Sequence, residues 1–188
     1  TFYRHIVGIN MLKGQTVIAR YRHARHESYN RSQTSLASIG CSVYLAEIDS
    51  RALDAVDAVW SKYSRHHWPN GQVPDWKAER RHYANRLDRF EVAVWCGSDL
   101  CGLGIGSPSN GKNHLSVRLI EGSPMPGHPL KGSVLLAVAD VAETYAKALG
   151  CQEVRFVNPL HGAVNIYSNL GFPLVTPLKG APYCGRRI

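Results

Sequence analysis

Tyr167 carries a phenol that could donate a proton. It lies in VNPLHGAVNIYSNLGF, residues 157–172, where an Asn-Pro turn precedes a short helix-like stretch that stops at Gly171. A phenol with an ordinary pKa of about 10 is protonated at neutral pH, so it can donate a proton to a developing anion held within about 3 Å. Alternatively, Tyr167 packs its ring under a sheet and forms a hydrogen bond outward.

The segments around Tyr167 are predicted to alternate between strands and helices. Strands are expected at 42–48, 90–96, 100–107, 113–121, 151–158 and after 171–178, and helices after a cap at Asp49 or Ser50 and at 76–89, 133–149 and 162–169. The helix at 133–149 has the clearest pattern, because its polar residues fall on one side and Gly150 provides a stop. Three prolines in the preceding loop exclude a helix there.

Length and composition indicate one soluble domain. The 188 residues are 44% hydrophobic, which suits a single α/β core. The sequence has no run of 18 apolar residues and no signal-peptide pattern, so no membrane contact is expected. The five cysteines are scattered and odd in number, which favours reduced thiols and a cytoplasmic location over a disulfide framework.

Positive charge is concentrated in residues 1–40. This segment carries six Lys and Arg residues against Glu27 alone, and so contributes five of the formal net charge of +8. We expect a basic N-terminal extension, either a solvated arm or an added edge strand, with a boundary near Gly40 before a second unit at 41–188. Its interleaved Arg, His and Tyr residues are also compatible with contacts to nucleic acid.

The order of these elements, together with AVNIYSNLGF, resembles the GNAT superfamily of N-acetyltransferases. The resemblance covers roughly residues 41–178, and the residues that carry it are Ala163, Tyr167, Leu170, Gly171 and Phe172. It implies a mixed α/β fold (α+β, with a strongly twisted sheet) and acetyl-CoA as co-substrate. In many members the matching tyrosine protonates the leaving CoA thiolate, so the resemblance implies that Tyr167 is the general acid.

The resemblance also implies a site for the CoA pyrophosphate in the loop before residue 134. The family pattern R/Q-x-x-G-x-G/A would place its signature residues at Gly127, Leu130 and Gly132, so two of the three differ here. Backbone N–H groups can still bind a diphosphate, although Pro129 removes one donor, and Lys131 or His128 could add positive charge. The residues expected to bind CoA are Leu119, Ile120, Leu130, Lys131, Gly132, Ser133 and Asn158.

Acetyl transfer requires a neutral amine, so the resemblance also calls for a base or a water relay. His114 is the expected catalytic base, because an imidazole with an ordinary pKa of about 6.5 can accept a proton at neutral pH. Alternatively, His114 is an exposed residue at the end of a strand. Glu121 and Glu47, each near the end of a predicted strand, are the other candidate bases.

Acetylation of a primary amine is therefore the predicted activity. The basic surface favours an acceptor on an anionic carrier, such as aminoacyl-tRNA or an acidic protein. The alternative is a non-catalytic GNAT-like module that binds nucleic acid or protein. No metal site is expected, and the sequence leaves a homodimer open.

Overall fold

The structure is a computed structural model that describes residues 2–65, 68 and 71–188, with side chains described from residue 16 onward. Its elements are α1 (Phe2–Ser38), β1 (Tyr44–Ala46), α2 (Ser50–Ala58), η1 (Trp60–Lys62), α3 (Trp76–His82), β2 (Phe90–Cys96), β3 (Asp99–Pro108), β4 (Leu115–Gly122), α4 (Val134–Leu149), β5 (Glu153–Val157), η3 (His161–Ala163), α5 (Val164–Asn169), β6 (Leu174–Val175) and β7 (Tyr183–Arg187). Among these residues, no helix has the length and apolar character needed to cross a bilayer.

The described strands form one seven-stranded mixed sheet in the order β1-β2-β3-β4-β5-β7-β6. β4 and β5 are parallel, whereas the other neighbouring pairs are antiparallel. The connection between the two parallel strands contains α4, as a parallel crossover requires. This architecture confirms the predicted mixed α/β fold.

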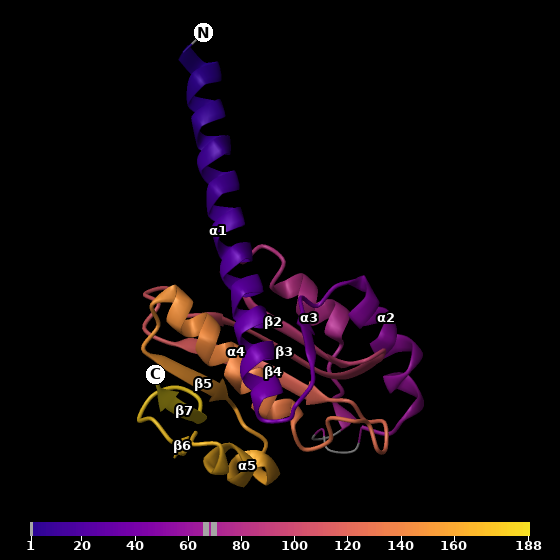
Figure 1. The fold of residues 1–188 in the computed structure, drawn as a ribbon. Helices are drawn as coiled ribbons and strands as arrows, with labels where there is room; N and C mark the ends of the chain where they lie inside the picture. Colours follow the sequence, from indigo (N-terminus) through magenta and orange to yellow (C-terminus); the bar gives the residue numbers. More distant parts are fainter. Residues whose placement is uncertain (1, 66–67, 69–70) are drawn as a thin grey trace.

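Helices cover both faces of the sheet, and each face has its own apolar core (Figure 1). One core lies under α1 and α4 and includes Phe90, Tyr145 and Phe156. The other lies under α2 and α3 and includes Trp60 and Trp76. The sheet thus separates two packed layers, and β4 contributes side chains to both.

α4 begins one residue after the predicted start and ends at the predicted stop. Ser133 is its N-cap residue, and Gly150 takes a left-handed φ of 78° at its C-terminal end. Two glycines of β3 allow close approach, because a Cβ atom on Gly102 or Gly104 would lie 2.2 or 2.9 Å from the side chain of Val134 or Val138. The sequence CGLGIG therefore brings the first turns of α4 directly onto the sheet.

Of the two alternatives for residues 1–40, the added edge strand is wrong, because residues Phe2–Ser38 form a helix, α1. The C-terminal half of α1 packs against α4, with Tyr29 and Leu36 buried in the core and Ser32 Oγ donating to Thr144 Oγ1 at 3.4 Å. The N-terminal half extends beyond the rest of the fold (Figure 1). The sequence pattern does not predict this helix, because much of its docked face is small or polar and has no clear apolar period.

Candidate active site

β4 and β5 are paired only over part of their length. Leu115–Val117 of β4 pair with Val154–Phe156 of β5, and β4 then continues to Gly122 while β5 ends at Val157. Residues 118–122 therefore extend past the last β4–β5 pair. The two parallel strands part at this point, which leaves the backbone edge of β4 open to a ligand that can pair with it.

A β-bulge in β4 coincides with this separation. Val117 is opposite Gly106 and Leu119 is opposite Ile105, so Arg118 is the extra residue of the bulge. Gly106 allows the close contact, because a Cβ atom there would lie 2.0 Å from the Ser116 carbonyl oxygen. Beyond the bulge, Leu119 packs toward the α2–α3 core and Ile120 toward the α4 core. The bulge thus presents side chains of β4 to both layers at the parting of the strands.

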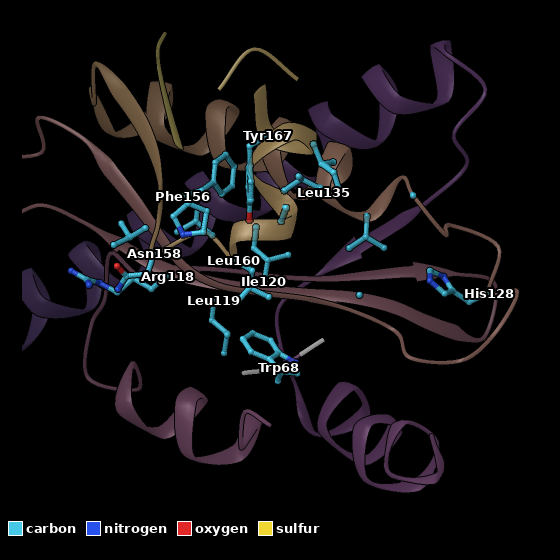
Figure 2. A pocket seen from close by; sticks show the side chains of 18 residues that line it. Trp68, Arg118, Leu119, Ile120, His128, Leu135, Phe156, Asn158, Leu160 and Tyr167 are labelled. Carbon is cyan, nitrogen blue, oxygen red and sulfur yellow. The ribbon is translucent and has the colours of Figure 1, made fainter. Parts of the chain in front are cut away.

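A cavity of about 280 Å³ lies at this parting (Figure 2). Among the residues expected to bind CoA or act in catalysis, Leu119, Ile120, Gly132, Asn158 and Tyr167 line it. Other lining residues include Trp68, Arg118, His128, Val134, Leu135, Phe156, Leu160 and Ile166. Segments more than 90 residues apart in the sequence thus meet around one cavity.

Tyr167 points its hydroxyl group into the cavity from α5 (Figure 2). Its ring packs on Phe156, with ring centroids 5.0 Å apart, and Phe156 in turn meets Phe172 edge to face at 4.9 Å. Burial, with a smaller contribution from Cys184, raises the pKa of Tyr167 to about 12. The phenol is therefore protonated throughout the physiological pH range and is held at the cavity by aromatic packing.

The N-terminus of α4 also borders the cavity, through Gly132, Val134 and Leu135. The first N–H groups of a helix have no partner within the helix, and the Ser133 side chain makes no capping hydrogen bond here among the described residues. Together with the helix dipole, these N–H groups favour an anion at this end of the cavity. No proline of the preceding loop, residues 123–133, is among the lining residues that the structure describes.

The side chains of this loop do not all lie where the sequence analysis placed them. Leu130 is 6% exposed and belongs to the core, Lys131 is exposed, and neither these two residues nor Ser133 is among the described residues that line the cavity. The backbone N–H groups of Lys131 and Ser133 are used within the loop, by His128 O and Leu130 O. His128 is buried, and burial followed by the charge of Lys131 lowers its pKa, so the expected positive charge at position 128 is absent at neutral pH.

No family model and no curated protein sequence matches this chain, but solved structures do. PaiA N-acetyltransferase from Thermoplasma acidophilum, solved with coenzyme A, is 15% identical with a TM-score of 0.54, and the match covers 78% of this chain and 99% of that one. The GNAT domain of a PAT from S. lividans is 11% identical with a TM-score of 0.55, covering 77% and 89%. The ribosomal-protein-S18-alanine N-acetyltransferase from Escherichia coli is 11% identical with a TM-score of 0.53, covering 78% and 94%.

The chain has the GNAT fold. At these identities the comparison establishes the fold, and the predicted resemblance is confirmed at that level. In this GNAT fold, the parted strands, the start of α4 and Tyr167 all border the same cavity.

His114, the expected catalytic base, is not among the described residues that line the cavity. It precedes β4, five residues before Leu119, which corresponds to about 16 Å along an extended strand. Burial, followed by the nearby charge of Arg155, lowers its pKa, so His114 is neutral at pH 7. The alternative interpretation of His114 as a strand-end residue agrees with this position, and its role as catalytic base stays a prediction.

The two alternative bases are engaged in ion pairs. Glu47 accepts hydrogen bonds from Arg25 at 3.2 and 3.3 Å and lies 3.7 Å from His26, so it helps to hold α1 in place. The Glu121 side chain is fully buried and paired with Arg65. Neither carboxylate is among the described residues that line the cavity.

Sequence reasoning did not assign several cavity residues. Leu160, just before η3, Ala163 of η3 and Ile166 of α5 line the cavity, and their spacing of three residues is a helical signal that could have identified them. Arg118 had no such signal, because it faces the cavity only as the extra residue of a bulge.

Proposed function

We propose that this protein is an acetyl-CoA-dependent N-acetyltransferase that acts on a primary amine. The observation that carries the proposal is the convergence on one cavity of an unpaired β4 edge, the N-terminus of a 16-residue helix and a protonated tyrosine. The GNAT fold supports the same activity, because a structural neighbour was solved with coenzyme A. Acetyl-CoA would supply an activated acyl thioester.

Different residues at the cavity are suited to bind the pantetheine arm and the diphosphate of CoA. The open edge at Leu119 and Ile120 can pair with the amide groups of a pantetheine arm, as an added strand would. The N–H groups at the start of α4, next to Gly132, can bind a diphosphate. The differences from the family pattern at 127 and 130 should have little effect on diphosphate binding, because the backbone makes this contact. The Leu130 side chain is buried in the core.

Tyr167 acts as the proton donor in this proposal. When the amine nitrogen attacks the carbonyl carbon, the C–S bond breaks and its electron pair moves to sulfur. The Tyr167 hydroxyl stabilises that negative charge by a hydrogen bond and supplies the proton, while the proton lost from the amine goes to water. A phenol with a pKa of about 12 cannot itself act as the base, because it is already protonated.

An acceptor on an anionic carrier fits the charges at the cavity. Arg118 is exposed at the cavity and has no ion-pair partner in the part of the chain that the structure describes. No carboxylate lines the cavity among these residues, so nothing there favours a polycationic amine. A phosphate or carboxylate close to the amine would be drawn to Arg118. Aminoacyl-tRNA and acidic protein termini therefore remain the proposed acceptors.

Two measurements test this proposal. Isothermal titration should detect acetyl-CoA binding, and absence of binding at millimolar ligand would instead favour the non-catalytic module. With a panel of peptides and aminoacyl-tRNA as acceptors, Tyr167→Phe should lower turnover by about 10²-fold or more while leaving CoA affinity unchanged. Tyr183→Phe is the matched control, because Tyr183 packs on Arg155 and is not among the described cavity residues. An unchanged rate in Tyr167→Phe would remove Tyr167 from this role.

A further inference from the structure

Glu121 is a fully buried carboxylate directly beside the cavity. Its side chain has 0% exposure and lies on β4 two residues after Leu119, on the same face of the sheet. Arg65 binds both carboxylate oxygens, with Nε donating to Oε1 at 2.5 Å and Nη2 donating to Oε2. Two tryptophans add indole N–H donors, from Trp68 to Oε1 at 3.0 Å and from Trp76 to Oε2 at 2.7 Å.

This arrangement makes Glu121 an anchor. A buried carboxylate is tolerated when a cation and further donors satisfy its oxygens, and here each oxygen accepts from the guanidinium group and from an indole. Removal of a proton from an incoming amine would require a carboxylate accessible to that amine. The Glu121 carboxylate is enclosed, so an incoming amine cannot reach it.

One of the two anchored indoles borders the cavity. Trp76 is 2% exposed and lies in the α2–α3 core, whereas Trp68 is partly exposed and lines the cavity. Figure 2 places Trp68 next to Leu119 on one side of β4 and Tyr167 with Ile120 on the other side. The Trp68 indole N–H donates to Glu121, and Trp68 itself lines the cavity.

We propose that Glu121 is a positioning residue that fixes the Trp68 indole as a wall of the acceptor side of the cavity. The acceptor then carries an apolar or aromatic group beside its primary amine, which packs on Trp68 and Leu119. This inference rests on the proposed acetyl transfer, in which the thiol leaves on the Tyr167 side of β4 and the amine enters from the Trp68 side.

Acceptor preference tests the wall. With acetyl-CoA and three simple amines (glycinamide, leucinamide and phenylalaninamide), kcat/KM should rise with the size of the apolar group. Trp68→Ala should lower kcat/KM for phenylalaninamide about tenfold and leave that for glycinamide within about twofold, with CoA affinity unchanged. Glu121→Gln should reduce the same preference, because an amide has one oxygen acceptor and cannot serve both indoles. A preference unchanged in both variants would overturn the acceptor assignment.

Indole resonances test the anchor independently of activity. The chain has four tryptophans, so an ¹⁵N-tryptophan sample gives four indole N–H signals. Glu121→Gln should shift those of Trp68 and Trp76 and leave that of Trp95 in place. Glu91→Gln, the same change at another fully buried glutamate, is the matched control and should not move the Trp68 signal.

The two readouts separate the possible failures. An unshifted Trp68 signal in Glu121→Gln would overturn the anchor even if the enzyme is active. Absence of turnover with all three amines and with the acceptor panel, despite shifted indole signals, would overturn the proposed function and the acceptor wall while the anchor stands.

Discussion

Two glutamates in this sheet have 0% exposed side chains, and they serve different parts of the molecule. Glu91 on β2 lies near Arg80 and Arg89, whose Nε atoms are each 2.7 Å from a carboxylate oxygen. Arg89 makes a hydrogen bond, whereas the contact with Arg80 is an ion pair without hydrogen-bond geometry. Glu121 on β4 instead accepts, among the described residues, from the guanidinium group of Arg65 and from the indole N–H groups of Trp68 and Trp76.

The difference lies in the donors. The two cations at Glu91 come from α3 and from the residue just before β2, and neither is among the described cavity residues, so this group ties α3 to the sheet. At Glu91, Arg89 donates to the carboxylate through Nε and to the Arg86 carbonyl oxygen through Nη1, so its guanidinium group is used within the fold. At Glu121, the Trp68 indole donates through its one N–H group, and Trp68 also lines the cavity. A buried carboxylate can therefore hold the fold together at one position and shape a binding surface at another.

Glu91→Ala should give the largest effect on stability. It leaves two guanidinium groups without their carboxylate, and breaking a buried ion pair costs about 3–5 kcal/mol. Urea denaturation should report a loss of this size, with the acceptor preference of the remaining folded protein unchanged. A loss below about 1 kcal/mol would mean that the Glu91 ion pair is hydrated. Glu91 would then not be the structural counterpart of Glu121.

Alkaline pH should destabilise the protein through buried tyrosines on the α1 side and at the cavity, by a smaller amount than Glu91→Ala. Burial raises the pKa of Tyr145, near Arg25 on the α1 side, to about 12, and that of Tyr167 at the cavity also to about 12. Below pH 10 both phenols are neutral in the folded and unfolded states. Above pH 10 only the unfolded state ionises, so stability falls as pH rises toward 12, by about 1.4 kcal/mol per pH unit for a fully buried phenol.

Urea midpoints at pH 8, 10 and 11 measure this loss. Tyr145→Phe should remove more of it than Tyr167→Phe, because Tyr145 is 1% exposed whereas Tyr167 borders a cavity that admits water. The opposite order would indicate that the cavity side is the drier of the two.

Tyr29→Phe should have the smallest effect. The Tyr29 hydroxyl donates to the Glu91 carbonyl oxygen at 2.5 Å, and this bond links α1 to β2. Loss of one buried hydrogen bond costs about 1 kcal/mol, with some additional cost from the carbonyl left without its donor. Thermal unfolding should show the shift, and proteolysis within α1 should become faster. Unaltered proteolysis would show that α1 docks mainly through other contacts, such as Arg25 with Glu47.

Regular local patterns predicted most of the fold. α4 and the β2–β3 hairpin follow from periodicity and turn residues, and the motif ending at Phe172 correctly indicated Tyr167 as a residue of the cavity. His114 is not among the described cavity residues, because sequence spacing does not tell which end of a strand meets the cavity. The sequence analysis did not predict α1 as a helix, because the docked face of α1 is largely small or polar. Its hydrogen bonds with distant segments leave no apolar period in the sequence.

The sequence alone determined which segments become helix or strand in most of the domain, because apolar periodicity and turn residues act over a few neighbouring positions. Only the tertiary structure decided that Arg118 is the extra residue of a bulge, that α1 is a docked helix and that Glu121 gathers Arg65, Trp68 and Trp76. These features depend on strand register and on the burial of charge. Both are set by contacts between residues far apart in the chain, so no local pattern of side chains encodes them.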